Sequence, residues 1–578
     1  MDSDVLTEPA AAARRMTAPS TADPLWWRSA VIYQVYVRSF ADGNGDGTGD
    51  LAGVRDHLGY LKDLGVDAIW FNPWYPSPLA DGGYDVSDYR DIHPQFGTLE
   101  EAEALIHEAL ALGIRTIIDV VPNHVSDQHP WFQAALAAGP GSPERERFWF
   151  HPGKGEHGDE IPTHWVSSFQ GETWTRTTNP DGTPGEWYLH MFTPEQPDLN
   201  WNHPDVRREH EDILRFWFDR GVAGVRIDSA ALLIKDADLP EVGEKPEHPT
   251  EDRDELHDVY RGWRAVADSY PGTRVLVGEI WVPDIDRFTA YLRPDEMHTA
   301  FNFDFLARPW GAASFRDSIT QTLGAHAPVG APSTWVLSNH DVTRPVTRYG
   351  REDTAFAFLK KRFGVPTDPQ LGLHRARAAA LLVAALPGSL YIYQGDELGL
   401  PEVEDLPVEL IEDPMHYRSG GTDPGRDGCR VPLPWEGERT PFGFGPAGAV
   451  PWLPQPADWT ALTVEAQDAD PHSTLNLYRD ALRLRRALPE LGDGPLDWWD
   501  DAVPGAADLL AFRRGDAFAC VVNTGDVAVP LPAGATVLLS SVPLEDALPG
   551  NSTAWLRIDG QTETPITTTT PEDSASRS

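Results

Sequence analysis

The chain has 578 residues, of which 41% are hydrophobic and 10% aromatic, so it can bury several cores and is not a disordered protein. Its 47 basic and 89 acidic residues give a formal net charge of −42. Nucleic acids and anionic membrane surfaces would be repelled by such a chain, so neither is an expected partner. The sequence leaves the oligomeric state open.

Cysteine usage and the N-terminal residues bear on the compartment. Cys429 and Cys520 are too few for a disulfide framework, and the chain has no Cys-x-x-Cys metal motif. The first residues, MDSDVLTEPAAAARRM, lack the apolar core of a secretory signal. The longest apolar run, 378–386, is about half of the ~18 residues that a membrane span needs. These features predict a cytoplasmic protein without a membrane span.

Short β-rich segments alternate with helical patterns along most of the chain. Helical periodicity, as at 99–113, lies between most of the β-rich segments. Such an alternation predicts an α/β fold with a parallel sheet, and eight strands fit a (β/α)8 TIM barrel. The expected strands are VIYQVYV at 31–37, AIWF at 68–71, TIIDVV at 116–121, GVRID at 224–228, RVLVGEI at 274–280, FNFDF at 301–305, WVLSNH at 335–340 and SLYIYQ at 389–394.

Two connections are too long for ordinary barrel loops, and both ends of the chain are low in complexity. After about residue 490 the pattern changes to alternating strands around the turn at 514–516. The expected division is a disordered tail over 1–24, a barrel over 25–124 and 204–490 with a long loop at 396–470 after its eighth strand, an inserted loop-rich domain over 125–203 after its third strand, a C-terminal antiparallel β-sandwich over 491–560 and a disordered tail over 561–578.

Three carboxylates follow barrel strands at the end where barrel enzymes build their active sites. Asp228 follows the fourth expected strand, Glu279 the fifth and Asp341 the seventh. Arg226 shares a strand face with Asp228 and would hold it ionised, as a nucleophile requires. The apolar neighbours of Glu279 would favour the protonated form that a proton donor needs. Acidic residues clustered at a barrel mouth indicate glycoside-bond chemistry.

Four segments resemble, in chain order, the hallmark segments of the alpha-amylase family, glycoside hydrolase family 13. They are DVVPNH at 119–124, GVRIDSA at 224–230, GEIW at 278–281 and SNHD at 338–341. QPDLN at 196–200 resembles an additional segment of the oligo-1,6-glucosidase and alpha-glucosidase branch. The resemblance covers about residues 26–560. It implies the following roles: Asp228 as nucleophile, Glu279 as general acid/base, Asp341 as transition-state stabiliser, and His124, Arg226 and His340 as further parts of the sugar site.

Two further segments, GGYDVSDY at 82–89 and GRDGCR at 425–430, resemble pocket-closing segments of alpha-glucosidases. The resemblance implies that Asp85 and Arg426 close the pocket around a terminal glucose. Tyr84 would offer a ring face to the apolar side of the sugar. A pocket closed in this way would make the enzyme exo-acting. An ordinary Asp–Arg bridge between two loops is the alternative.

The resemblance implies a retaining alpha-glucosidase that removes terminal glucose from maltose-like oligosaccharides through a covalent glucosyl-enzyme, with glucosyl transfer as a second outcome. Ser229 follows the nucleophile where family members that cut α-1,6 bonds usually have Val and several that cut α-1,4 bonds have Thr or Ala. A small hydroxyl side chain favours α-1,4 substrates. An oligo-1,6-glucosidase and an isomerising enzyme that makes trehalose or isomaltulose remain alternatives. A non-catalytic family member would lack the acids and carry a membrane helix, so it is disfavoured.

A loop rich in glycine and acidic residues follows the first expected strand. It places oxygen donors at positions 1, 3, 5, 7 and 9 of a calcium-type loop: Asp42, Asn44, Asp46, the Thr48 carbonyl and Asp50. Position 12 is Gly53 rather than a bidentate Glu, so the loop is not an EF-hand. Similar loops bind Ca²⁺ in the alpha-glucosidase branch. We expect a structural Ca²⁺, with Mg²⁺ or a Gly/Asp turn without an ion as alternatives.

Overall fold

The computed structural model describes residues 23–179 and 181–558, so the expected tails lie outside the described residues apart from residues 23 and 24. Eight parallel strands form one sheet in the order β10-β11-β1-β2-β3-β7-β8-β9. The Asn302 N–H, just after β9, donates to the Thr334 carbonyl in β10 at 3.1 Å, which brings the two ends of the sheet together. The predicted barrel is therefore confirmed. Its strands are β1 Val31–Val35, β2 Ala68–Phe71, β3 Arg115–Val120, β7 Gly224–Ile227, β8 Val275–Gly278, β9 Thr299–Ala300, β10 Thr334–Val336 and β11 Ser389–Tyr393.

The sixth strand differs from the prediction. Its two residues, in β9, come before the FNFDF segment, and α8 (Phe303–Ala307) occupies most of that segment. The Asn302 side chain accepts the Phe305 N–H at 2.9 Å and so caps this helix. The aromatic residues that suggested a strand are therefore helical because a capping residue precedes them.

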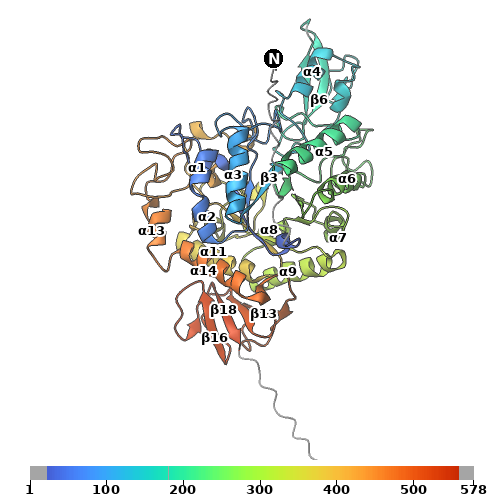
Figure 1. Cartoon of the computed structure of the whole chain (residues 1–578). Coiled ribbons are helices and arrows are strands. Elements are labelled where there is room, and N and C mark those ends of the chain that lie inside the picture. Colours follow the sequence, from blue (N-terminus) through green and yellow to red (C-terminus); the bar gives the residue numbers. More distant parts are fainter. Residues whose placement is uncertain (1–22, 180, 559–578) are drawn as a thin grey trace, which may run out of the picture.

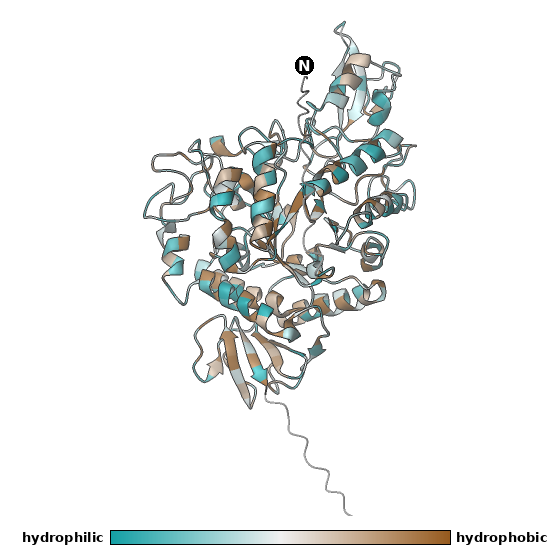
Figure 2. Cartoon of the chain, in the orientation of Figure 1, coloured by the Kyte–Doolittle hydropathy of each residue, from teal (hydrophilic) through white to brown (hydrophobic). Residues whose placement is uncertain are grey.

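Helices cover the outside of the barrel, and local sequence signals set their ends. Thr98 and Glu101 form a reciprocal capping box at the start of α3, and Pro204 opens α5 at the first helical position. Hydrophilic residues follow the outer faces of the helices, while hydrophobic residues follow the central strands (Figure 2). The helices are α1 Leu51–Asp56, α2 Leu58–Leu64, α3 Leu99–Ala111, α5 Pro204–Asp219, α6 Leu256–Asp268, α7 Ile285–Ala290, α9 Ala312–His326, α10 Pro345–Tyr349, α11 Pro369–Ala385 and α14 Thr474–Ala487.

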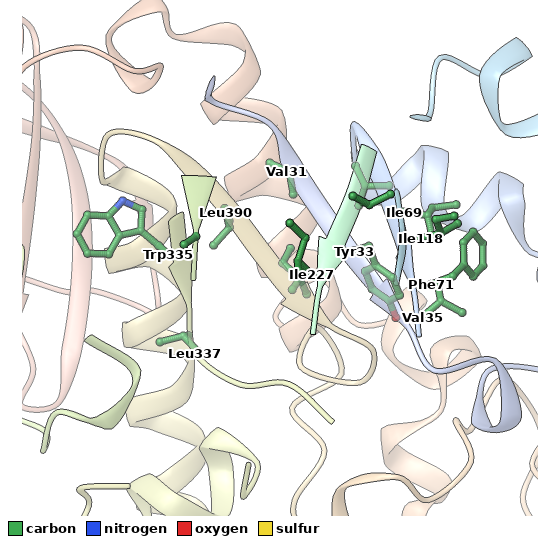
Figure 3. Close-up of a cluster of buried hydrophobic side chains, with 14 of the residues drawn as sticks. Val31, Tyr33, Val35, Ile69, Phe71, Ile118, Ile227, Trp335, Leu337 and Leu390 are labelled. Atoms are coloured by element: carbon green, nitrogen blue, oxygen red, sulfur yellow. The ribbon is translucent and has the colours of Figure 1, made fainter. Parts of the chain in front are cut away.

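Alternation along each barrel strand separates two apolar cores. On β1, Val31, Tyr33 and Val35 belong to the core between the strands and the helices, where Figure 3 shows them among other buried side chains. Ile32, between them, belongs to a second cluster together with Trp70, Ile117 and Tyr391 from neighbouring strands. Because strand residues alternate between faces, this second cluster fills the barrel interior.

Two residues further along these strands, the interior changes from apolar to polar. Gln34 follows Ile32, Asp119 follows Ile117, and Arg226 follows Gly224 on the inward-facing positions. All three polar side chains are buried. This polar layer lies toward the carboxyl ends of the strands, where it forms a floor for the site described below.

Two smaller units lie at opposite ends of the barrel (Figure 1). The 125–203 insertion carries α4 (Pro130–Ala138) and the three-stranded antiparallel sheet of β4 (Phe150–His151), β5 (Trp174–Thr178) and β6 (Pro184–Leu189). The C-terminal unit docks on α11: Thr553 Oγ1 donates to the Ala378 carbonyl at 2.8 Å, and Trp555 Nε1 to the Leu381 carbonyl at 3.0 Å. This unit has a five-stranded sheet of β12 Asp497–Trp498, β13 Leu509–Arg514, β14 Phe518–Asn523, β16 Ala535–Ser540 and β18 Ser552–Ile558, and a pair of β15 Val529–Pro530 and β17 Ala547–Leu548.

The long loop after β11 contains two short helices, α12 (Pro414–Arg418) and α13 (Val464–Asp468). Through Met415, at the start of α12, this loop packs against the apolar cluster of the insertion. Across residues 23–179 and 181–558, none of the helices has both the length and the apolar character that crossing a bilayer requires.

Candidate active site

A cavity of about 330 Å³ opens at the carboxyl ends of the barrel strands. The floor beneath it is the polar layer of the barrel, and the insertion and the loop after β11 supply part of its wall. Of the nine residues predicted to act in catalysis or sugar binding, seven line this cavity: Tyr84, His124, Asp228, Glu279, His340, Asp341 and Arg426. Arg226 lies in the polar layer just beneath the cavity, whereas Asp85 does not line the cavity.

Arg226 joins two of the predicted catalytic acids. Its Nη1 lies 2.7 Å from Asp228 Oδ1, and its Nη2 lies 2.6 Å from Glu279 Oε2. Nη1 also lies 2.8 Å from Oδ1 of Asp119. Asp228 and Glu279 directly follow β7 and β8, which pair in parallel, so the sheet itself brings the two acids to one guanidinium. Two carboxylates held side by side at a cavity can serve one reacting atom.

Three buried carboxylates thus face a single cation. Burial raises the pKa of Asp119 to about 7, against the opposing charge of Arg226. Burial also raises the pKa of Asp228, and the negative charges of Glu279 and Asp119 raise it further, while Arg226 lowers it. The predicted ion pair between Arg226 and Asp228 is present, but its cation is shared. This cluster therefore holds a proton more readily than isolated carboxyl groups do.

The two oxygens of Glu279 have different partners. Oε2 accepts the Ser229 N–H at 3.0 Å in addition to its contact with Arg226, and Oε1 accepts the indole N–H of Trp281 at 3.1 Å. Ser229 has φ 45°, in the left-handed region that a non-glycine residue rarely adopts. This conformation directs its N–H toward the acid, a local strain of the kind found at functional sites.

Asp341 lies in a more positive environment than Asp228. Arg426 Nη1 lies 3.0 Å and Arg430 Nη2 3.1 Å from its Oδ1. Burial raises the pKa of Asp341, but contact with His340 and the positive charges of Arg426 and Arg430 outweigh burial and lower the pKa well below its usual value. Asp341 is therefore anionic across the physiological range, as a group that binds sugar hydroxyls requires.

The expected pairing of Asp85 with Arg426 is wrong. Arg426 Nη2 pairs with Asp81 Oδ1 at 2.6 Å, and its Nε pairs with Asp413 Oδ2 at 2.7 Å. Asp85 is buried in its own loop, where it accepts the N–H groups of Ala80 at 2.9 Å and Asp81 at 3.1 Å. Because Asp85 holds the turn, it cannot also reach across the cavity. Asp81 makes the bridge to Arg426 that the sequence analysis assigned to Asp85.

Aromatic and histidine side chains complete the inner end of the cavity. Tyr84 and His340 stack with ring centroids 5.2 Å apart and planes 7° from parallel. Burial lowers the pKa of His340 well below its usual value, so the ring is neutral. Gln34 Nε2 lies 2.8 Å from Nδ1 of His340 and donates to it, so the proton of His340 is on Nε2. This N–H is directed at Asp341 Oδ2, which lies 3.3 Å away. Burial also lowers the pKa of His124, to about 4.

Sequence reasoning missed several residues of the site. Asp81 lies three residues before Tyr84 in the same DGGY run, and Asp119 opens the DVVPNH segment, so both were within reach of a motif search. Phe169 of the insertion, whose ring lies 4.7 Å from the Arg426 guanidinium carbon, comes from a segment with no periodic pattern. Phe358 and Met415 line the cavity from long loops, and no sequence signal identified them.

The predicted cation loop lies apart from this cavity. Asp42 accepts the N–H groups of Gly45 at 2.6 Å and Gly47 at 2.8 Å. Asp50 accepts the Gly53 N–H at 2.7 Å and caps α1. Within the described part of the chain, no three His, Cys, Asp or Glu side chains are grouped so as to hold a metal ion. The loop carboxylates stabilise the turn through backbone N–H groups.

Comparison with known proteins agrees with this geometry. Residues 34–494 match the model of the alpha-amylase catalytic domain. The chain belongs to the alpha-amylase family. It is 36% identical over 530 residues to a probable alpha-glucosidase of Rhizobium meliloti (strain 1021), covering 87% of this chain and 90% of that protein. It is 33% identical over 502 residues to an oligo-1,6-glucosidase of Parageobacillus thermoglucosidasius, covering 80% of this chain and 84% of the relative.

Solved structures include a close match as well. An alpha-glucosyl transfer enzyme, XgtA, superposes with a TM-score of 0.79 at 33% sequence identity, over 92% of this chain and 99% of that one. The alpha-amylase family member described here is therefore a glycoside hydrolase by family, of the glucosidase or glucosyl-transferring kind.

Proposed function

We propose that this family member is a retaining, exo-acting alpha-glucosidase that releases terminal glucose from maltose-like oligosaccharides and also transfers it. The observation that carries the proposal is the pair of acids on Arg226, Asp228 and Glu279, which face a cavity whose other side is bridged by Asp81 and Arg426. The similarity to a probable alpha-glucosidase and to a glucosyl transfer enzyme supports the same assignment.

The chemistry follows from the positions of these acids. Asp228 attacks C1 of the glucose while Glu279 gives its proton to the departing oxygen, which leaves a glucosyl ester on Asp228. Water or a sugar hydroxyl then attacks C1, its proton passes to Glu279, and the Asp228 carboxylate is released. Asp341, held anionic by two arginines, would bind the sugar hydroxyls throughout.

The Asp81–Arg426 bridge is the basis for exo action. The two side chains come from loops far apart in sequence and are joined at 2.6 Å beside Asp341. A bridge at that place would leave room for one terminal glucose and block a chain that continues beyond it. Ser229, which lines the cavity next to the nucleophile, favours α-1,4 substrates in this proposal.

Proton NMR of the purified protein with maltose, isomaltose, sucrose and trehalose in separate tubes tests the proposal. Glucose is expected first as the α-anomer, with maltose consumed faster than isomaltose. An Asp228→Asn variant is expected to lose turnover by at least about a thousandfold. First release of the β-anomer, or full turnover by this variant, would exclude the retaining mechanism. Conversion of a disaccharide to an isomer without free glucose would assign an isomerising activity.

We also propose that the 42–50 loop binds a structural divalent cation, Ca²⁺ before Mg²⁺. The carboxylate, amide and carbonyl oxygens of Asp42, Asn44, Asp46, Thr48 and Asp50 are the donors that such hard cations prefer. Carboxylate oxygens that accept an N–H group retain a lone pair for an ion. The loop lies outside the cavity, so the ion would stabilise the fold rather than act on substrate.

Chelation tests this second proposal. Removing divalent ions from the purified protein is expected to lower its thermal unfolding midpoint, and Ca²⁺ is expected to restore it. Asp46 is exposed, and its Oδ1 accepts the Thr48 N–H at 2.8 Å, so an Asp46→Asn variant removes the charged ligand and keeps an acceptor for this turn. This variant is expected to lose the Ca²⁺ response. A midpoint that neither chelator nor Ca²⁺ changes in the starting protein would refute the site.

A further inference from the structure

A second cavity, of about 420 Å³, is lined by residues between 343 and 366, in α10 and its connection to α11. Five of its lining side chains are basic, although acidic residues outnumber basic ones by 89 to 47 in the whole chain. A local excess of cations in such an acidic protein indicates a site for an anion. The basic residues are Arg348, Arg351, Lys360, Lys361 and Arg362, and the acidic ones are Glu352 and Asp353.

Ion pairs neutralise only some of these cations. Within the described residues, the guanidinium groups of Arg348 and Arg362 form no ion pair and donate to carbonyl oxygens instead. Two of the five positive charges are therefore free to meet an anion in the cavity. The three paired cations are Lys360 with Asp353 at 2.8 Å, Arg351 with Glu404 at 2.6 Å and Lys361 with Asp423 at 3.7 Å.

Arg348 is the unusual member of this group because it is buried. The residue is only 2% exposed, and its Nη1 and Nη2 donate to the carbonyls of Leu306 and Leu337, each at 2.8 Å. A guanidinium carries five N–H groups, and the Nε of Arg348 is buried without an acceptor among the described residues. A buried charge without a counter-charge is costly. An anion in the cavity that Arg348 lines would supply the missing charge.

The chemistry of this wall suits a phosphate group. Phosphate oxygens accept charge-assisted hydrogen bonds from guanidinium and ammonium groups alike. The catalytic cavity offers no such place, because Arg426 is the only arginine or lysine among its described lining residues and already pairs with three carboxylates. A phosphate ion alone would leave most of 420 Å³ unfilled. The remaining wall, with Phe356, Val365 and Pro366, can contact the rest of a larger molecule.

One short segment contributes to both cavities. The 3-10 helix η5 (Phe358–Lys360) places Phe358 in the wall of the catalytic cavity, whereas Lys360 and Lys361 line the second cavity. Lys361 Nζ also donates to the carbonyl of Gly425 at 3.0 Å, next to Arg426 in the chain. A ligand held by the two lysines would therefore fix the segments that carry Phe358 and Arg426.

We propose that this second cavity binds a phosphate-bearing small molecule of about the size of a sugar phosphate, and that the bound molecule is an effector of the catalytic cavity. The binding site stands on its own geometry. The effector role rests on the proposed glucosidase function, and it acts by holding Phe358 and Arg426 in place for the sugar.

Calorimetric titration with glucose 6-phosphate tests the binding site. Saturable binding with a Kd of about 1 mM or tighter is expected at constant ionic strength, and saturating glucose is expected not to displace it. Inorganic phosphate is expected to bind at the same site more weakly, because it fills less of the cavity. Phosphate that binds as tightly as the ester would identify the free ion as the ligand of this site.

Arginine variants locate the binding. Arg362→Gln and Arg348→Gln are each expected to weaken the Kd for glucose 6-phosphate at least about tenfold. Arg439→Gln is the matched control, because Arg439 is also exposed and lies outside the cavity lining, and its Kd is expected to change less than about twofold. Arg362 is exposed, so its variant keeps the test decisive even where loss of the buried Arg348 unfolds the chain.

Three results would overturn the site: no saturable binding up to about 20 mM ester, displacement of the ester by glucose, or equal weakening by Arg362→Gln and Arg439→Gln. For the effector role, saturating glucose 6-phosphate is expected to lower the maltose KM about threefold in the starting protein and to leave KM unchanged in Arg362→Gln. Tight binding with an unchanged or raised KM would overturn this role. Absence of maltose turnover without the ester would refute the proposed glucosidase, while calorimetry would still decide the binding site.

Discussion

Replacing Asp119 by Asn tests the electrostatics of the active-site floor. Asp119 is fully buried beside Arg226, and burial raises its pKa from 3.8 to about 7. At about 1.4 kcal/mol per pH unit, that difference amounts to an upper bound of about 4 kcal/mol. Because the folded state binds this proton more tightly than the unfolded state, the group lowers the free energy of unfolding as pH rises from about 4 to about 7. Asparagine does not titrate, so the variant lacks this loss.

The measurement is urea unfolding of both proteins between pH 5 and 8.5. The free energy of unfolding of Asp119→Asn minus that of the starting protein is expected to grow by about 2 to 3 kcal/mol from pH 5 to 7 and to level off above pH 7. Other titrating groups are common to both proteins and cancel. Asp56→Asn, at an exposed position at the end of α1, is expected to give a flat difference. A flat or falling difference for Asp119→Asn would refute the reasoning.

Two further predictions concern buried ion pairs. Asp81→Asn is expected to raise the maltose KM at least about tenfold, because it breaks the bridge to Arg426. Asp85→Asn is expected to leave KM unchanged. Equal effects of the two variants on KM in initial-rate measurements would restore the first assignment of Asp85. Lys235→Met leaves Asp198, its partner at 2.6 Å, buried without a cation, and is expected to lower the free energy of unfolding by about 3 to 5 kcal/mol. Adding Asp198→Leu is expected to recover most of that loss in thermal unfolding, and no recovery would contradict the pairing argument.

Strand periodicity made the centre of the site predictable. A parallel barrel brings the carboxyl ends of its strands to one rim, so the positions of Asp228, Glu279 and Asp341 after strands were enough to place them together. The alternation of faces likewise placed Arg226 beneath Asp228. These inferences needed only the chain's local order and the closed geometry of the sheet.

Predictions that depended on how loops turn were less successful. Asp81 and Asp85 lie four residues apart in one loop, and only the turn that Asp85 holds with two backbone N–H groups decides which carboxylate reaches Arg426. The prediction of the sixth strand was wrong for a related reason, because the helix cap at Asn302 outweighs the β-favouring composition of the residues that follow it. The aromatic side chains that line the cavity, such as Phe358 from a long loop, are placed by contacts between residues that are distant in sequence.

The different surroundings of the acids suggest where the protons lie at neutral pH. Two arginines hold Asp341 anionic, while three carboxylates share Arg226. Burial raises the pKa of Asp119 to about 7, so this group can hold a proton near neutral pH, and the pKa of Asp228 in the same cluster is raised as well. Once Asp119 is neutral, the positive charge of Arg226 is shared by only two carboxylates, the two acids that face the cavity. The buried aspartate then supports an ionised nucleophile without touching the sugar, which is why its neutral isostere should stabilise the fold and leave the reacting pair in place.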